Sequence, residues 1–169
     1  FNDYIAIRGL YRANDEKREA VLQRLTQAVS TERLAHILSV ERETDRFCEW
    51  LDVPKKETEE LRLAALLHDL TKENSPEEEE KIRQTYGVTP DRDDLRCQAA
   101  LHGLSASLIA EHEFSLSADA VSAIRYHTTG RAEMTVAEKI LYLADFTEKL
   151  LKLESVKIPS FDFTTGCRS

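Results

Sequence analysis

The sequence predicts an all-α fold, in which one compact domain is built as a helical bundle. Apolar residues recur with the helical period in every long segment, and no stretch shows the strict alternation of a half-buried strand. Capping residues and prolines divide the chain into pieces of helical length. With 169 residues, of which 41% are hydrophobic, the chain can bury one sizeable core.

Two helices are predicted before Pro54. Asp15 is the expected cap of a leading helix that continues to about residue 29, and Ser30 starts a second helix that Pro54 ends. A third helix is predicted over residues 57–68. Its LAALL run is too apolar for a surface element, so we expect this helix at the centre of the bundle.

A fourth predicted helix begins at Ser75 and Pro76, a capping serine followed by a proline in the first turn. The acidic run 77–80 faces the positive end of this helix's dipole, so we interpret it as a solvated first turn rather than a metal-binding patch. Three more helices are predicted, at residues 95–112, 117–127 and 134–152.

Charge and cysteine content restrict the classes of partner and the cellular setting. The net charge of −8 disfavours sequence-independent binding to nucleic acid or to an anionic membrane. No apolar run is long enough to span a membrane, and no N-terminal signal segment is visible. Cys48, Cys97 and Cys167 are scattered and odd in number, which favours reduced thiols in the cytoplasm. We expect Cys97 to be a small buried thiol rather than a metal ligand.

Four of the five histidines lie on or beside apolar helical faces: His36, His68, His102 and His127. The fifth, His112, lies between two glutamates and is expected at the surface. Asp69 and Asp145 also lie among apolar residues, where a carboxylate is unfavourable unless it is paired or bound to a cation. One buried histidine is usually a core residue, but the whole set favours a metal site. Imidazole and carboxylate ligands together suit iron, manganese or zinc.

The pair His68-Asp69 also carries a geometric requirement. Neighbouring residues of a helix point about 100° apart, so both can reach one ion only near a helix end. Gly103 directly follows His102, and Gly130 comes shortly after His127. Each glycine either lets the backbone approach a ligand closely or ends or kinks a helix, and the sequence leaves both alternatives open.

Five sequence blocks occur in order: RLAH (33–36), AALLHDLTK (64–72), HG (102–103), AIRYHTTG (123–130) and KILYLADFTE (139–148). Within them, His36, His68-Asp69 and Asp145 follow an H…HD…D pattern. The chain thereby resembles the HD-domain metallophosphohydrolases, and more narrowly the YqeK-type symmetrical diadenosine tetraphosphate hydrolases of bacteria. The resemblance places an HD domain at residues 31–152, after an N-terminal segment with the leading helix (1–30) and before a C-terminal tail (153–169).

The resemblance implies a role for each matching residue. The implied metal ligands are His36, His68, Asp69 and Asp145, with His102 and His127 serving either a second metal or the nucleotide phosphates. The implied catalytic residues are Asp69, Lys72, His102 and His127. The implied substrate contacts are Arg33, Asp69, Lys72, His102, His127 and Thr128. Family members cleave diadenosine tetraphosphate symmetrically to two ADP, with iron as the expected metal, one or two ions per chain. The resemblance is also compatible with a homodimer.

Two departures from the family pattern lie towards the C-terminus. The family usually has an arginine shortly after the ADxxE block, where this chain has Leu150, Leu151 and Lys152. The final residues, IPSFDFTTGCRS, do not resemble the helical region that closes over the nucleotide in that family. The expected metal ligands are unaffected, because all of them precede this region.

Two other functions stay open on the sequence alone. One is an HD-domain nucleotidase or phosphodiesterase that acts on another nucleotide, since HDLTK resembles the HDxGK element of cyclic-dinucleotide enzymes. Their downstream GYP-type motif is absent from this sequence. The other is a non-catalytic metal- or nucleotide-binding protein, which the complete set of expected ligands disfavours.

Overall fold

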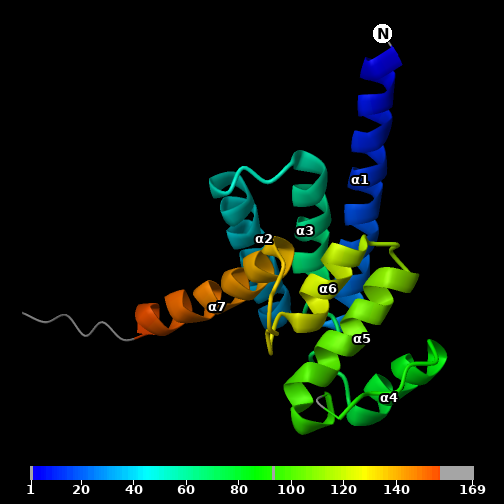
Figure 1. The fold of residues 1–169 in the computed structure, drawn as a ribbon, viewed down its shortest axis with the longest axis vertical. Helices are drawn as coiled ribbons and strands as arrows, with labels where there is room; N and C mark the ends of the chain where they lie inside the picture. Colours follow the sequence, from blue (N-terminus) through cyan, green and yellow to red (C-terminus); the bar gives the residue numbers. More distant parts are fainter. Residues whose placement is uncertain (1, 93, 157–169) are drawn as a thin grey trace, which may run out of the picture.

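The computed structural model describes residues 2–92 and 94–156, and this part of the chain contains seven α-helices, one short 3-10 helix and no strand (Figure 1). The helices are α1 (Asn2–Ala28), α2 (Thr31–Trp50), α3 (Lys55–Leu67), α4 (Pro76–Thr85), α5 (Gln98–His112), α6 (Ala118–Tyr126) and α7 (Val136–Val156), with η1 (Asp94–Arg96) before α5. The predicted all-α class is confirmed. Residues 157–169, which include Cys167 and most of the predicted tail, lie outside the described residues.

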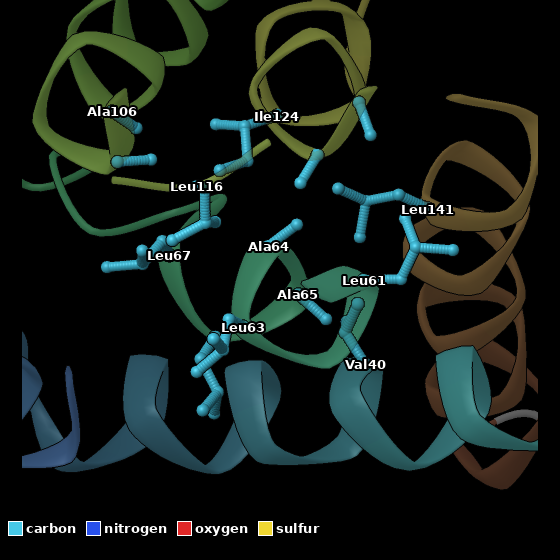
Figure 2. Close-up of a cluster of buried hydrophobic side chains, with 14 of the residues drawn as sticks. Val40, Leu61, Leu63, Ala64, Ala65, Leu67, Ala106, Leu116, Ile124 and Leu141 are labelled. Carbon is cyan, nitrogen blue, oxygen red and sulfur yellow. The ribbon is translucent and has the colours of Figure 1, made fainter. Parts of the chain in front are cut away.

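Helix α3 lies at the centre of the bundle, as its apolar sequence predicts. Figure 2 shows α3 between α2 on one side and α5 and α6 on the other, with α7 alongside. Every residue from Leu63 to Leu67 is buried. Ala64 and Ala65 are fully buried, and such small side chains allow neighbouring helices to pack closely around α3. The C-terminal end of α3 is therefore held firmly in the middle of the molecule.

Serine caps set the start of several helices. The Ser30 hydroxyl accepts a hydrogen bond from the Arg33 backbone N–H at 3.2 Å, and Ser75 and Glu78 form a reciprocal capping box at the start of α4. Ser30 also donates to Glu73, through its backbone N–H and its hydroxyl, at 2.7 Å each. The first turn of α2 is thus fastened to the loop that follows α3.

Two expectations about individual residues are wrong. Helix α1 begins at Asn2, so Asp15 lies inside the helix and does not cap it (Figure 1). No proline interrupts residues 2–14, and a helix already under way continues cooperatively through an internal Asp. Cys97 is exposed rather than buried, because it occupies the N-cap position before α5 and lies outside the packed face of that helix.

Gly103 allows two helices to pack closely, a role different from the two predicted alternatives, which were an approach of the backbone to a ligand and a helix end. A Cβ atom at this position would lie 3.0 Å from the Arg125 carbonyl oxygen and 3.3 Å from the Ile124 carbonyl oxygen. Glycine therefore allows α5 and α6 to approach closely, which brings their histidines together. Gly130 adopts φ +61 shortly after α6 ends, in agreement with the helix-end alternative. None of the described helices is both long and apolar enough to cross a membrane.

Candidate metal centre

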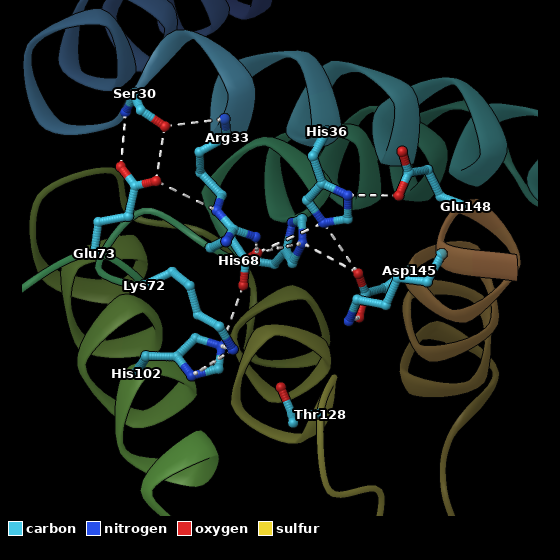
Figure 3. Close-up of polar contacts among 12 residues, drawn as sticks. Ser30, Arg33, His36, His68, Lys72, Glu73, His102, Thr128, Asp145 and Glu148 are labelled. Atoms are coloured by element: carbon cyan, nitrogen blue, oxygen red, sulfur yellow. Dashed lines mark hydrogen bonds and ion pairs between the residues drawn. The ribbon is translucent and has the colours of Figure 1, made fainter. Parts of the chain in front are cut away.

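Six buried side chains from five helices or their ends converge on one region: His36, His68, Asp69, His102, His127 and Asp145. Figure 3 shows four of them: His36, His68, His102 and Asp145. Two of the six follow from the way in which α3 ends. Helix α3 stops at Leu67, His68 is its C-cap, and Asp69 lies in the turn that follows. Both neighbouring side chains can therefore point the same way, as the sequence required.

Asp69 divides its two carboxylate oxygens between two groups of ligands. Its Oδ2 lies 3.5 Å from the Nε2 of His36 and 3.7 Å from the Nε2 of His68. Its Oδ1 lies 3.2 Å from the Nε2 of His102 and 3.5 Å from the Nε2 of His127. Within each group the donor atoms all lie within 4.8 Å of one another. One carboxylate thus joins two candidate ion sites.

Asp145 completes the first group from α7. Its Oδ1 lies 3.2 Å from the Nε2 of His36 and 3.8 Å from the Nε2 of His68. All three of these atoms are buried and have no hydrogen-bond partner. Buried polar atoms are rarely left without a partner. Imidazole nitrogens and a carboxylate oxygen that face one point are what a transition-metal ion requires, so the residues present fit such an ion.

The opposite ring nitrogens of the histidines are engaged by hydrogen bonds. The Nδ1 of His68 lies 2.6 Å from the Ala65 carbonyl oxygen, and the Nδ1 of His127 lies 2.7 Å from the Ile124 carbonyl oxygen. A carbonyl oxygen only accepts, so each Nδ1 carries the proton and each Nε2 presents a lone pair to the cluster. Both rings are therefore oriented so that Nε2 could bind an ion in the cluster.

Burial and the neighbouring charges fix the ionisation of the cluster. Burial lowers the pKa of His68 to about 4 and also lowers the pKa of His102, so both rings are neutral, as ligands must be. Burial alone would raise the pKa values of Asp69 and Asp145, yet the surrounding imidazoles hold both below the ordinary range. Burial opposes protonation of His36 too, but Asp145 and Glu148 raise its pKa. Both aspartates are therefore ionised, as ligands of a metal ion would be.

Basic and hydroxyl side chains surround the cluster. The Arg33 guanidinium donates from Nη1 to Asp69 Oδ2 at 2.8 Å, and Lys72 Nζ lies 3.3 Å from the Nε2 of His102. Thr128 Oγ1 lies 2.9 Å from the Nε2 of His127. Every side chain that the sequence predicts for the site thus lies in or beside this cluster.

Two cavities are lined by residues of the cluster and its surroundings. One of about 350 Å³ is lined by residues that include Lys72, Arg83 and His102. The other, of about 280 Å³, is lined by residues that include Arg33, His36 and Lys149. Each cavity therefore adjoins one of the two ligand groups and contains basic side chains. His112 lies away from this region, half-exposed and stacked on Tyr86 with ring centroids 4.5 Å apart, as expected of a surface residue.

Two further residues, Glu148 and Lys149, lie at the site although no sequence motif pointed to them. Glu148 lies 2.6 Å from His36 Nδ1, and Lys149 forms a short ion pair with Asp145. Both belong to α7, where positions three and four residues after Asp145 share its face. That spacing was the available signal, and Glu148 is the last residue of the KILYLADFTE block.

Comparison with known proteins places this geometry in a family. A family model described as the HD domain matches residues 33–150. The symmetrical bis(5'-nucleosyl)-tetraphosphatase of Staphylococcus aureus is 36% identical over 93 residues, which cover 54% of this chain and 47% of that protein. The symmetrical bis(5'-nucleosyl)-tetraphosphatase of Bacillus subtilis is 29% identical over 131 residues, which cover 78% of this chain and 69% of that protein. The chain thus spans between about half and about two-thirds of the length of these relatives.

A solved structure has a similar arrangement of helices. It is that of a predicted HD superfamily hydrolase involved in NAD metabolism from Clostridium acetobutylicum, with a TM-score of 0.69 and 29% sequence identity. The match covers 78% of this chain and 68% of that protein. The HD-domain match over residues 33–150 spans most of the chain and includes all six clustered histidines and aspartates. The chain therefore belongs to the HD-domain family.

Proposed function

We propose that this chain is a metal-dependent hydrolase of dinucleoside polyphosphates, which cleaves diadenosine tetraphosphate symmetrically into two ADP. The observation that carries the proposal is the pair of buried ligand groups joined by Asp69, with Lys72 and Arg33 beside them. The similarity to symmetrical bis(5'-nucleosyl)-tetraphosphatases supports the substrate class and the position of the cut.

The ligand sets suggest one or two ions per chain. His36, His68, Asp69 and Asp145 would hold the first ion, while Asp69, His102 and His127 could hold a second. Iron is the first candidate, and manganese or zinc would also suit this mixture of imidazoles and carboxylates. A bound ion would activate water and offset the negative charge that develops on the phosphoryl group.

The side chains around the cluster would grip the polyphosphate. Lys72 and Arg33 carry the positive charge that pairs with non-bridging phosphate oxygens, and the Thr128 hydroxyl adds a donor. Burial lowers the pKa of Lys72, so its charge is poorly hydrated and is available to an anionic ligand. These contacts would hold one ADP half next to the ligand groups.

The reaction would break the central bridging P–O bond. Water supplies the hydroxyl group that bonds to the second phosphorus of the gripped half, and the proton that the water loses passes to solvent. The other ADP leaves with the electrons of the broken P–O bond. Lys72, beside His102, lies where it can donate a hydrogen bond to the oxygen that gains this charge. The cavities of about 350 Å³ and 280 Å³, lined by His102 and by His36 respectively, offer space for both halves of the substrate.

A second candidate is hydrolysis of another nucleotide by the same centre. It is favoured by the Clostridium acetobutylicum hydrolase, which is described as involved in NAD metabolism. The basic side chains and candidate ion sites of the present chain would also match the negative charge of a mononucleotide or a cyclic dinucleotide. The choice between these substrates depends on the length of phosphate chain that Lys72 and Arg33 can span.

One experiment separates these functions from a non-catalytic role. The purified chain is freed of metal, reconstituted with ferrous iron, manganese or zinc, and analysed for bound metal. Turnover is then compared on diadenosine tetraphosphate, ADP and a cyclic dinucleotide. We expect bound metal and fastest turnover on diadenosine tetraphosphate. Metal binding without turnover of any substrate would indicate a binding protein, and faster turnover of another nucleotide would favour the second candidate.

We further propose residues 31–152 as the catalytic domain of a cytoplasmic enzyme. The three cysteines of the sequence, which are scattered and odd in number, support this compartment. A homodimer is the expected assembly, and light scattering at several protein concentrations tests it. A mass equal to one chain at every concentration would contradict the dimer.

A further inference from the structure

Glu148 is a buried acid in α7 that contacts the candidate metal centre from behind. One of its carboxylate oxygens, Oε2, lies 2.6 Å from the Nδ1 of His36, and the other, Oε1, lies 2.7 Å from the Nζ of Lys152 (Figure 3 shows the contact with His36). The Glu148 side chain is only 4% exposed. It is three residues after Asp145, so one face of α7 presents two carboxylates to the same histidine.

His36 differs from two other candidate ligands in how its ring is held. The Nδ1 atoms of His68 and His127 bond to carbonyl oxygens three residues earlier in their own helices. These contacts come with the local backbone. The ring of His36 is held by an acid 112 residues away in the sequence, on another helix. Its orientation therefore depends on the packing of α2 against α7.

We propose that Glu148 is a positioning residue for the metal centre, and this inference rests on the proposed metal site. By accepting the hydrogen bond from His36 Nδ1–H, Glu148 fixes the ring with Nε2 directed towards Asp145 Oδ1 at 3.2 Å and Asp69 Oδ2 at 3.5 Å. A carboxylate behind a ligating histidine also makes that imidazole a stronger electron donor. Lys152 holds the other oxygen of Glu148 and so restrains its rotamer.

A purely structural role makes a different prediction. If Glu148 only balances Lys152 or fills space in the packing of α7, then any substitution that preserves volume should leave metal binding unchanged. If Glu148 acts through His36, the ability of its side chain to accept a hydrogen bond must matter. Two replacements of similar size separate these roles: Glu148→Met cannot accept from Nδ1–H, whereas Glu148→Gln can.

The test measures zinc affinity by competition with a chelator, using the metal-depleted full chain. We expect Glu148→Met to weaken zinc binding by about 10–100-fold, as is typical when the acid behind a metal-bound histidine is lost. Glu148→Gln should remain within about 10-fold of the parent, because its amide oxygen still accepts. Glu32→Ala is the control, since Glu32 is an exposed acid that, like Glu148, lines the cavity of about 280 Å³.

Proton NMR of the zinc-loaded proteins gives a readout that does not depend on activity. The Nδ1 proton of His36 should be protected from solvent exchange in the parent and in Glu148→Gln, and should exchange rapidly in Glu148→Met. Equal zinc affinity in the parent and Glu148→Met would overturn this inference while leaving the proposed function intact, and so would equal losses in Glu148→Met and Glu148→Gln. A parent chain that binds no metal would instead contradict the proposed function itself.

Discussion

His68 is the candidate ligand whose removal should have the clearest effect. Its side chain is fully buried, and its unpaired Nε2 faces Asp69 and Asp145. His68→Ala removes a ligand and leaves two buried carboxylates less well compensated, so we expect bound metal and hydrolytic activity to fall together. Metal analysis of the purified variant measures this. His112→Ala is the matched control, and full metal content in His68→Ala would contradict the ligand assignment.

Lys72 should contribute to substrate binding rather than to metal binding. Its Nζ lies beside His102, and it lines the cavity of about 350 Å³. Lys72→Met removes a charged donor to phosphate, which is worth about 1.5–3 kcal/mol, so kcat/KM should fall by about 10–100-fold. Steady-state kinetics on diadenosine tetraphosphate measure the loss, with Lys81→Met on the exposed side of α4 as the control. Loss of bound metal in Lys72→Met would show that its role is structural.

Among the helices, α7 supplies Asp145 and Glu148, and Glu138 fixes where this helix starts. Glu138 accepts a hydrogen bond from the Thr135 backbone N–H at 2.9 Å, while the Glu138 N–H donates to the Thr135 hydroxyl at 3.2 Å. The same carboxylate accepts from Ser122 of α6 and forms an ion pair with Arg131 at 2.7 Å. This capping box therefore joins α6, the following loop and α7.

The Glu138 contacts predict how stability depends on pH. Burial would raise the pKa of Glu138, but Arg131, Ser122 and Thr135 lower it below its ordinary value. The folded chain therefore binds this proton less readily than the unfolded chain. The ionised Glu138 carboxylate therefore stabilises the fold fully above the ordinary glutamate pKa of about 4.3. This stabilisation is lost as the pH falls through the lower pKa that Glu138 has in the folded chain.

Glu138→Gln should lower the free energy of unfolding by about 1.5–3 kcal/mol at neutral pH. Urea unfolding at a series of pH values measures the difference from the parent, which should shrink as the solution becomes acidic. Glu133→Gln, an exposed acid in the same loop, is the control. A difference that stays constant between neutral pH and about pH 3 would contradict the role of the Glu138 charge.

Local sequence signals predicted most helices because their causes are local. The Ser30 and Ser75 caps and the apolar run of α3 set helix bounds within a few residues of those expected. Gly103 and Glu148 could not be understood in the same way. Gly103 is required by the approach of α5 to α6, and the role of Glu148 depends on a contact between α2 and α7. Such contacts exist only once the helices have packed.

For the whole molecule, the arrangement of helices explains why the site residues are dispersed in the sequence. The central helix α3 brings His68 and Asp69 to the middle of the bundle, and α2, α5, α6 and α7 pack around that end. Each of these helices, or the residue that ends it, contributes one histidine or aspartate. The periodicity of the separate segments predicted the bundle, and the family resemblance predicted which residues meet. The sharing of Asp69 between two ligand groups emerged only from the structure.

The products of diadenosine tetraphosphate hydrolysis test the central claim most directly. The metal-reconstituted chain is incubated with the dinucleotide, and the products are separated by ion-exchange chromatography at early times. We predict ADP alone, because the gripped half of the substrate ends at its second phosphate. Equal amounts of AMP and ATP would mean that the phosphate chain binds one position away from the proposed register. No cleavage by a chain that carries its full complement of metal would contradict the proposed activity.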